Sequence, residues 1–245
     1  MRLQIFDDKL VLSHEAAKLV VQIAQAAIAD HQRFTFALSG GTTPGTMYSL
    51  LTQEPYRSQI NWNAVEIFWS DERCVSPADK DSNYRLAKEA LLTKVPIPAT
   101  QIHRMPADLP NRAAACQSYT DEMRQVFKTE GIPAFDLIQL GMGPEAHTAS
   151  LFPHQPSLHE SERLVSEVNV PKPPPERLTF TLPLLNAAHN ILFMVTGADK
   201  AEAIHEVIEG ERKPEEYPAQ NVHPDNGEVI WMLDTAAASN LQKRG

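Results

Sequence analysis

A histidine close to a carboxylate is the arrangement in this sequence with the clearest chemical meaning. His147 stands two residues after Glu145, in a glycine-rich segment that runs from Gly141 to Pro153. A neighbouring carboxylate fixes the tautomer of an imidazole and stabilises its protonated form, as a general base requires. A lone loop histidine is more often structural, but this setting favours a catalytic pair. The other histidines have no metal-ligand spacing, so no role and no metal site are assigned to them.

A second segment combines glycines with hydroxyl groups between a strand pattern and a helix start. Its members are Ser39, Gly40, Gly41, Thr42 and Thr43. Glycine lets the backbone approach a ligand closely, and the N–H groups at a helix start attract anions. The spacing fits neither a Walker loop nor a dinucleotide fingerprint. Phosphate binding and an ordinary tight turn therefore both remain open for this segment.

Two further groups of charged residues follow strand patterns. Ser70-Asp71-Glu72-Arg73 comes directly after an apolar run, and Arg73 could hold a phosphate through its planar fork. A surface ion pair between these residues is the plainer alternative. Lys200 falls in the first turn of an expected helix, where the helix dipole disfavours a cation. A bound anion would resolve that conflict, although the side chain could also point into water.

The elements that must position these residues alternate along the chain. Short apolar runs predict strands at 34–38, 65–69, 135–140, 190–195 and 228–233. Helices are expected at 13–30 with Ser13 as cap, at 44–51, 82–94, 111–128 and 199–209, and in an Ala-rich segment after the last strand. This alternation indicates a mostly parallel sheet covered by helices on both faces, with ligands beyond the carboxyl ends of its strands.

Composition limits the functions that the chain can have. The 245 residues carry a net charge of −9, which disfavours nucleic acid and anionic membranes as partners. Cys74 and Cys116 lack zinc-site spacing, and the acidic start at residues 1–8 does not fit a signal peptide. No apolar run is long enough to span a membrane. We expect a cytoplasmic protein with one α/β domain over 1–245, in which the proline-rich stretch 170–176 is a surface loop.

Five segments in order resemble the 6-phosphogluconolactonase family, across nearly the whole chain. They are Phe36 to Pro44, Trp69 to Arg73, Leu140 to Pro153, Arg177 to Asn186 and Thr196 to Ala201. The resemblance implies a Rossmann-like fold shared with the glucosamine-6-phosphate deaminases. It also implies hydrolysis of 6-phosphogluconolactone in the oxidative pentose phosphate pathway, with no metal or organic cofactor and no obligate protein partner. One departure is Glu145-Ala146-His147, where the family typically has Asp-Gly-His.

The deaminases are the natural competitor, because they resemble this chain in the glycine loop and the histidine loop. They typically carry a glutamate after the histidine and Asp-Glu-Tyr in the charged segment. This chain has Ala149-Ser150-Leu151 after His147 and Arg73 in place of the tyrosine. Both differences favour the lactonase. A sensor of sugar phosphates without catalytic activity is the alternative from another class, and the oligomeric state cannot be read from the sequence.

The expected mechanism follows from this resemblance. The phosphate of the substrate is placed on the N–H groups of the glycine loop, with Lys200 and Arg73 as counter-charges and Arg177 as a weaker candidate. Asp71 is a further candidate for the substrate-binding site. His147 then activates water for attack on the lactone carbonyl, and Glu145 orients the imidazole.

Overall fold

Six parallel strands form the central sheet of the computed structural model, which describes residues 1–242. Their order across the sheet is β1-β9-β8-β5-β2-β3. The strands are β1 Arg2–Phe6, β2 Phe34–Leu38, β3 Val65–Trp69, β5 Leu137–Leu140, β8 Asn190–Val195 and β9 Glu228–Asp234. Every pairing between neighbours is parallel, so all carboxyl ends meet at one edge. The expected fold class is confirmed.

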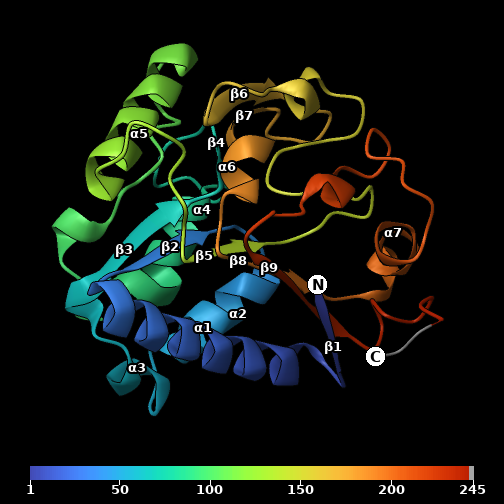
Figure 1. Cartoon of the computed structure of the whole chain (residues 1–245), viewed down its shortest axis with the longest axis horizontal. Coiled ribbons are helices and arrows are strands. Elements are labelled where there is room, and N and C mark those ends of the chain that lie inside the picture. The colour runs from blue at the N-terminus through green and yellow to red at the C-terminus, as the bar shows by residue number, and fades with distance from the viewer. Residues whose placement is uncertain (243–245) are drawn as a thin grey trace.

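Helices cover both faces of this sheet (Figure 1). The helices are α1 Lys9–His31, α2 Thr42–Leu51, α3 Tyr56–Gln59, α4 Asn83–Ala87, α5 Arg112–Phe127, α6 Leu182–Asn186 and α7 Ala201–Ile208. Figure 1 shows α1 and α2 on one face and α5 and α6 on the other. The apolar runs predicted as strands are buried between these layers: all five residues of β2 are buried.

A smaller antiparallel sheet lies beside α5 and was not predicted. It consists of β4 Asp71–Arg73, β7 Glu176–Phe180 and β6 Val165–Asn169, in that order. β6 and β7 form a hairpin whose connection is the proline-rich stretch, which is a surface loop as expected. The charged strand-end segment is therefore itself a strand, paired in register with β7, where Arg73 faces Arg177.

Several element boundaries differ from the sequence-based expectation. Asp8 caps α1, because its carboxylate accepts hydrogen bonds from the N–H groups of Leu10 and Val11. Ser13 lies inside the helix and donates to the carbonyl of Lys9 at 2.7 Å. The helix capped by Ser82 continues after α4 as a π-helix over Lys88–Leu92. The prediction of an Ala-rich closing helix is wrong for the described residues, since 235–240 form turns. Residues 243–245 lie outside the described part of the chain.

One buried histidine ties the central sheet to α5. His103 follows Ile102, which pairs with Ile67 of β3. Its two ring nitrogens lie 2.8 Å from a carboxylate oxygen of Glu66 and 2.7 Å from one of Glu122. Its ring also stacks on Phe68 with centroids 4.4 Å apart. This residue received no role from the sequence, and its place in the packing is structural.

Candidate active site

Four loops at the carboxyl ends of neighbouring strands surround one pocket of about 390 Å³. They follow β8, β5, β2 and β3, and the chain changes direction across the sheet between β5 and β2, where open α/β sheets bind their ligands. The pocket is lined by every site residue predicted from the sequence except Glu145: Ser39, Gly40, Gly41, Thr42, Thr43, Asp71, Arg73, His147, Arg177 and Lys200. The fold thus brings together residues that are far apart in the sequence.

Two positions in the glycine loop require glycine. A Cβ on Gly40 would lie 1.9 Å from Oδ1 of Asn83, and Gly41 has a φ of +114°. α2 begins directly afterwards, and no side chain caps its first N–H groups. These N–H groups at a helix start are suited to an anion.

The hydroxyl groups of this loop are partly engaged within the protein. Ser39 Oγ donates to Oε1 of buried Gln139 at 2.7 Å, so this hydroxyl is not a free donor for a ligand. Thr43 Oγ1 lies 2.8 Å from Oγ1 of Thr196, which joins the loop after β2 to the loop after β8. The side chain of Ser39 therefore shapes the loop, whereas the sequence suggested that it adds a donor.

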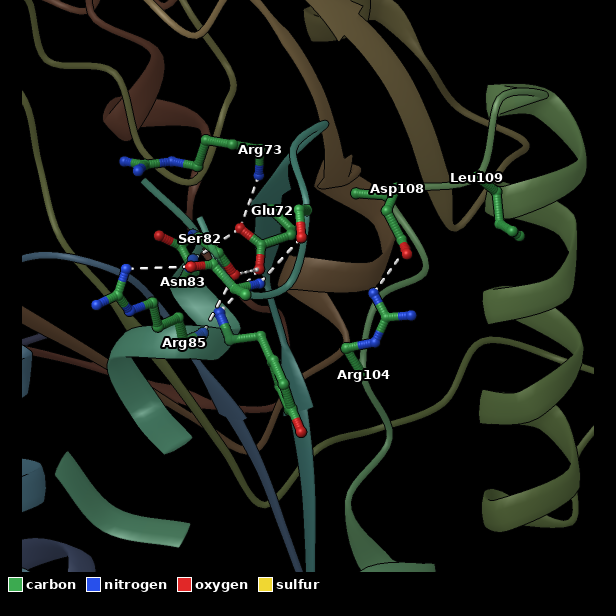
Figure 2. A network of polar contacts seen from close by, with 12 residues as sticks. Glu72, Arg73, Ser82, Asn83, Arg85, Arg104, Asp108 and Leu109 are labelled. Carbon is green, nitrogen blue, oxygen red and sulfur yellow. Dashed lines mark hydrogen bonds and ion pairs between the residues drawn. The ribbon is translucent and has the colours of Figure 1, made fainter. Parts of the chain in front are cut away.

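Glu72 turns inward and holds the start of α4 (Figure 2). Its carboxylate accepts hydrogen bonds from the backbone N–H groups of Arg73, Asn83 and Tyr84, each at 2.8 Å, and from the hydroxyl of Ser82 at 3.0 Å. Burial raises the pKa of Glu72, and the three backbone N–H groups act in the opposite direction. Glu72 is thus a structural residue that positions its neighbours Asp71 and Arg73.

Those two neighbours of Glu72 face the pocket. Asp71 accepts a hydrogen bond from Ser150 Oγ at 2.8 Å and another from Asn83 Nδ2 at 3.1 Å. Arg73 donates through Nη1 to the carbonyl of Asp81 at 2.7 Å, while its buried Nε has no partner within the described chain. Arg73 therefore keeps hydrogen-bonding capacity at the pocket. Arg73 forms no ion pair with Asp71 or Glu72, so the plainer alternative of a surface ion pair is not what the structure has.

His147 is held between a glycine and an aromatic ring. Its ring stacks on Phe152 with centroids 4.0 Å apart and an interplanar angle of 9°. A Cβ on Gly143 would lie 2.1 Å from Nδ1 of His147, so this position must stay without a side chain. Only 14% of the His147 side chain is exposed, and the ring lines the pocket.

Glu145 lies behind the imidazole and outside the pocket. Its Oε1 is 3.1 Å from Nδ1 of His147, although the two groups are not aligned for a full hydrogen bond within the described chain. This contact with His147 lowers the pKa of Glu145 to about 2, so the carboxylate is ionised at neutral pH. Ala146 between them has a φ of +57°, the conformation that the glycine typical of the family adopts without strain.

Arg177 is fully engaged with the protein. It is buried and donates through Nε to the carbonyl of Pro174 at 2.9 Å and through Nη2 to that of Lys172 at 3.0 Å. Its Nη1 lies 3.4 Å from Ser150 Oγ. Arg177 reaches the pocket wall as expected, but its hydrogen bonds position the proline-rich loop.

Sequence reasoning missed two residues of the pocket, Asn83 and Lys172. Asn83 was visible only as part of a capped helix start, and Lys172 only as a charge in a proline-rich loop. With Lys172, four cationic side chains line the pocket, together with Arg73, Arg177 and Lys200. Lys200 pairs with Asp199 at 2.6 Å and is 19% exposed. The pocket is thus locally positive, although the whole chain has a net charge of −9.

Residues 1–242 contain neither a cluster of metal-binding side chains nor a membrane-spanning helix. No group of three or more His, Cys, Asp or Glu side chains in this range could hold a metal ion. None of the helices in the same range has the length and apolar character needed to cross a membrane.

Fold and pocket together define an α/β enzyme whose site lies at the switch point of a parallel sheet. The family model of glucosamine-6-phosphate isomerases/6-phosphogluconolactonase matches residues 7–231. A 6-phosphogluconolactonase from Synechocystis is 41% identical, with 98% of each chain covered. A probable chloroplastic 6-phosphogluconolactonase from rice is 39% identical, covering 98% of this chain and 76% of the relative.

Solved structures agree with these sequence comparisons. The 6-phosphogluconolactonase from Trypanosoma cruzi superposes with a TM-score of 0.87 at 26% identity, covering 99% of this chain and 97% of the other. The chain belongs to the family of glucosamine-6-phosphate isomerases and 6-phosphogluconolactonases. The family expectation and the assignment to an enzyme of the 6-phosphogluconolactonase class, a hydrolase, are therefore confirmed. Because one relative is chloroplastic, the cytoplasmic localisation stays a prediction.

Proposed function

We propose that this chain hydrolyses 6-phosphoglucono-1,5-lactone to 6-phosphogluconate, with His147 as the general base, in the oxidative pentose phosphate pathway. One observation carries the proposal: an imidazole next to an ionised carboxylate lines the same pocket as a glycine loop at a helix start and four cationic side chains. The names of the relatives at 41% and 39% identity agree with this substrate.

The phosphate is proposed to bind the N–H groups of Gly40, Gly41 and Thr42. Lys200 and Arg73 line the same pocket and supply positive charge. A phosphate monoester carries about −1.5 to −2 charges at pH 7, so this end of the substrate is the strongly held one. Binding energy at the phosphate then positions the lactone carbonyl for reaction, which is how a remote group contributes to rate. Asp71 is left as an acceptor for sugar hydroxyl groups.

His147 is proposed to act through the nitrogen that does not face Glu145. The carboxylate near Nδ1 favours the tautomer with its proton on Nδ1, which leaves the lone pair on Nε2 free for a water molecule. Phe152 and Gly143 fix the plane of the ring. Because Glu145 remains ionised, it also stabilises the imidazolium that forms when water loses its proton.

The atoms balance over two steps. Water loses a proton to Nε2 while its oxygen forms a bond to the carbonyl carbon, giving a tetrahedral oxyanion. The oxyanion collapses, the bond from that carbon to the ring oxygen breaks, and the imidazolium returns its proton to the ring oxygen. The product acid then ionises, so the overall reaction consumes one water and releases one proton.

Hydrolysis of freshly generated 6-phosphogluconolactone, measured against the spontaneous rate, tests this proposal. We expect His147→Ala to lose about 10²–10⁴-fold in kcat, the usual contribution of a general base, and to keep its affinity for 6-phosphogluconate. His223→Ala is the matched control, because this histidine is exposed and outside the pocket. Full activity of His147→Ala would exclude the assigned base. A wild-type rate equal to the spontaneous one, with ammonia released from glucosamine 6-phosphate, would instead establish the deaminase alternative.

A further inference from the structure

Lys172 is a pocket residue whose ammonium forms no ion pair with the other described residues. It lies in the loop between β6 and β7 and lines the same pocket as the glycine loop. The side chain is exposed, and its ammonium has no carboxylate within 4.0 Å in the part of the chain that the structure describes. An unpaired cation at the wall of a pocket is available to a ligand.

The charge of Lys172 reaches both sides of the pocket. The pKa of Asp199 is lowered first by its hydrogen bond from Lys200, and the charge of Lys172 adds to this effect. The pKa of Glu145 is lowered first by His147, and Lys172 adds to that effect too. Lys172, His147 and Lys200 line the same pocket, so the charge of Lys172 acts on the space that a substrate would occupy.

The backbone that carries Lys172 is held rigidly. Arg177 donates to the carbonyl of Lys172 at 3.0 Å and to that of Pro174 at 2.9 Å. The N–H of Val170 donates to the carbonyl of Pro175 at 2.9 Å and closes the base of the loop. Proline fixes φ, and four of the six residues in 170–175 are prolines. The exposed lysine thus extends from a stiff, anchored loop, which limits the entropy lost when it meets a ligand.

We propose that Lys172 is a specificity-determining residue that recognises the phosphate dianion of the substrate from the rim of the pocket. The inference rests on the proposed function for the identity of the substrate. Lys200 holds the phosphate from the pocket wall, where it is 19% exposed and already paired with Asp199. Lys172 has no such competing partner and supplies the second ammonium. Two compact, strongly solvated charges on flexible stems are suited to a group that carries about two negative charges.

A pair of substrates with and without phosphate tests this role. We expect Lys172→Met to raise KM for 6-phosphogluconolactone about tenfold, since a charge-assisted hydrogen bond contributes about that factor, and to leave kcat within twofold. For glucono-1,5-lactone, which lacks the phosphate, kcat/KM should be unchanged. Lys172→Arg should restore most of the affinity because it keeps the charge.

The control separates a local effect from the loss of one surface charge. Lys18→Met changes the net charge equally, and Lys18 lies in α1, exposed and paired with Glu15. This variant should leave KM unchanged for both lactones. If Lys172→Met lowered kcat/KM equally for the two lactones, or mainly lowered kcat, Lys172 would act on the reacting carbonyl and the proposal would be overturned.

Equilibrium binding separates this inference from the proposed function. Titration of the wild type and of Lys172→Met with 6-phosphogluconate and with gluconate requires no catalytic activity. We expect about tenfold weaker binding of 6-phosphogluconate by the variant, and no difference for gluconate. Equal binding of 6-phosphogluconate by both proteins would overturn the role of Lys172, even if lactone hydrolysis were established. A tenfold difference in a protein that fails to hydrolyse the lactone would support Lys172 and contradict the reaction instead.

Discussion

Two imidazoles in this molecule lie against carboxylates, one in the packing between β3 and α5 and the other at the pocket. His103 is 6% exposed, and both of its ring nitrogens are hydrogen-bonded to carboxylates. His147 has one carboxylate next to Nδ1, which is not aligned for a hydrogen bond. Its ring borders the pocket. Each ring also stacks on a phenylalanine, so stacking does not distinguish them.

The difference between the two sites is the number of acceptors that each ring meets. Two carboxylates hold His103 protonated: burial acts to lower its pKa, but the hydrogen bonds of Glu122 and Glu66 outweigh this and raise the pKa to about 9. An imidazolium that stays charged at neutral pH has no lone pair with which to accept a proton. A single carboxylate leaves the second nitrogen of His147 available. A general base thus requires a partner on one side and open space on the other.

Gly143→Ala disrupts the proposed catalytic site most directly. The new methyl group would lie 2.1 Å from Nδ1 and 2.2 Å from Cε1 of His147, so the imidazole must move. Because a displacement of about 1 Å can cost about 10²-fold in rate, we expect kcat for lactone hydrolysis to fall at least that much. Gly131→Ala is the control, since its methyl group meets only Thr129 Oγ1 at 3.5 Å. Unchanged kcat in Gly143→Ala would show that the ring position is not critical.

His103→Gln acts on the structural site and should change stability instead of chemistry. Because the pKa of His103 is raised to about 9 in the folded protein, its stabilisation is complete below about pH 6.5 and is lost as pH rises through 9. We expect the wild type to lose about 2 kcal/mol more than the variant in its free energy of unfolding between pH 7 and pH 10, roughly thirtyfold in the folding equilibrium. Urea unfolding at both pH values measures this difference.

The same unfolding series separates His103 from an ordinary histidine. His223→Gln, at an exposed position, should show the pH dependence of the wild type. Per-molecule kcat of folded His103→Gln at pH 7 should match the wild type within about twofold, because the ring lies outside the pocket. Parallel pH dependence in His103→Gln and the wild type would contradict a protonated His103.

Phe152→Leu tests whether stacking matters more at the pocket than in the packing. Leucine keeps an apolar side chain but loses the flat face that lies 4.0 Å from the His147 ring. We expect kcat to fall about tenfold with KM unchanged, since a looser ring is misplaced only part of the time. Phe34→Leu, which loses its contact with Phe36 at the start of β2, should reduce stability and leave kcat unaffected. A rise in KM without a fall in kcat would assign Phe152 to substrate binding.

The central sheet could be predicted because its strands are short apolar runs bounded by turn signals. β2 and β8 are buried almost throughout, and buried strands give continuous hydrophobic runs. β1 was missed because Arg2 to Phe6 lies at the edge of the sheet and mixes polar with apolar residues. In the smaller sheet β4 was missed because it pairs with a segment about one hundred residues away, and Asp71-Glu72-Arg73 does not resemble a strand.

Site residues could be predicted where a chemically informative residue type came directly after a predicted strand. His147 and the glycine loop are such cases, and both line the pocket. Arg177 was weighed as a ligand for phosphate, yet its hydrogen bonds hold the backbone of the proline-rich loop, which only the folded hairpin reveals. The fit of Asn83 against Gly40 likewise depends on a contact between distant loops. Such tertiary contacts leave no local pattern in the sequence.

That fit between Asn83 and Gly40 has a consequence for how the molecule takes up a ligand. Asn83 Nδ2 is bonded to the backbone of Asp71 at 2.9 Å, while Glu72 fixes the backbone of Asn83 itself (Figure 2). The glycine loop, the proposed anion site, therefore packs against Asn83, whose own hydrogen bonds already hold it in place in the free protein. Its conformational entropy is lost during folding, so ligand uptake should involve little further ordering. Backbone order parameters in this loop should then be high in the free protein and change little when phosphate compounds bind.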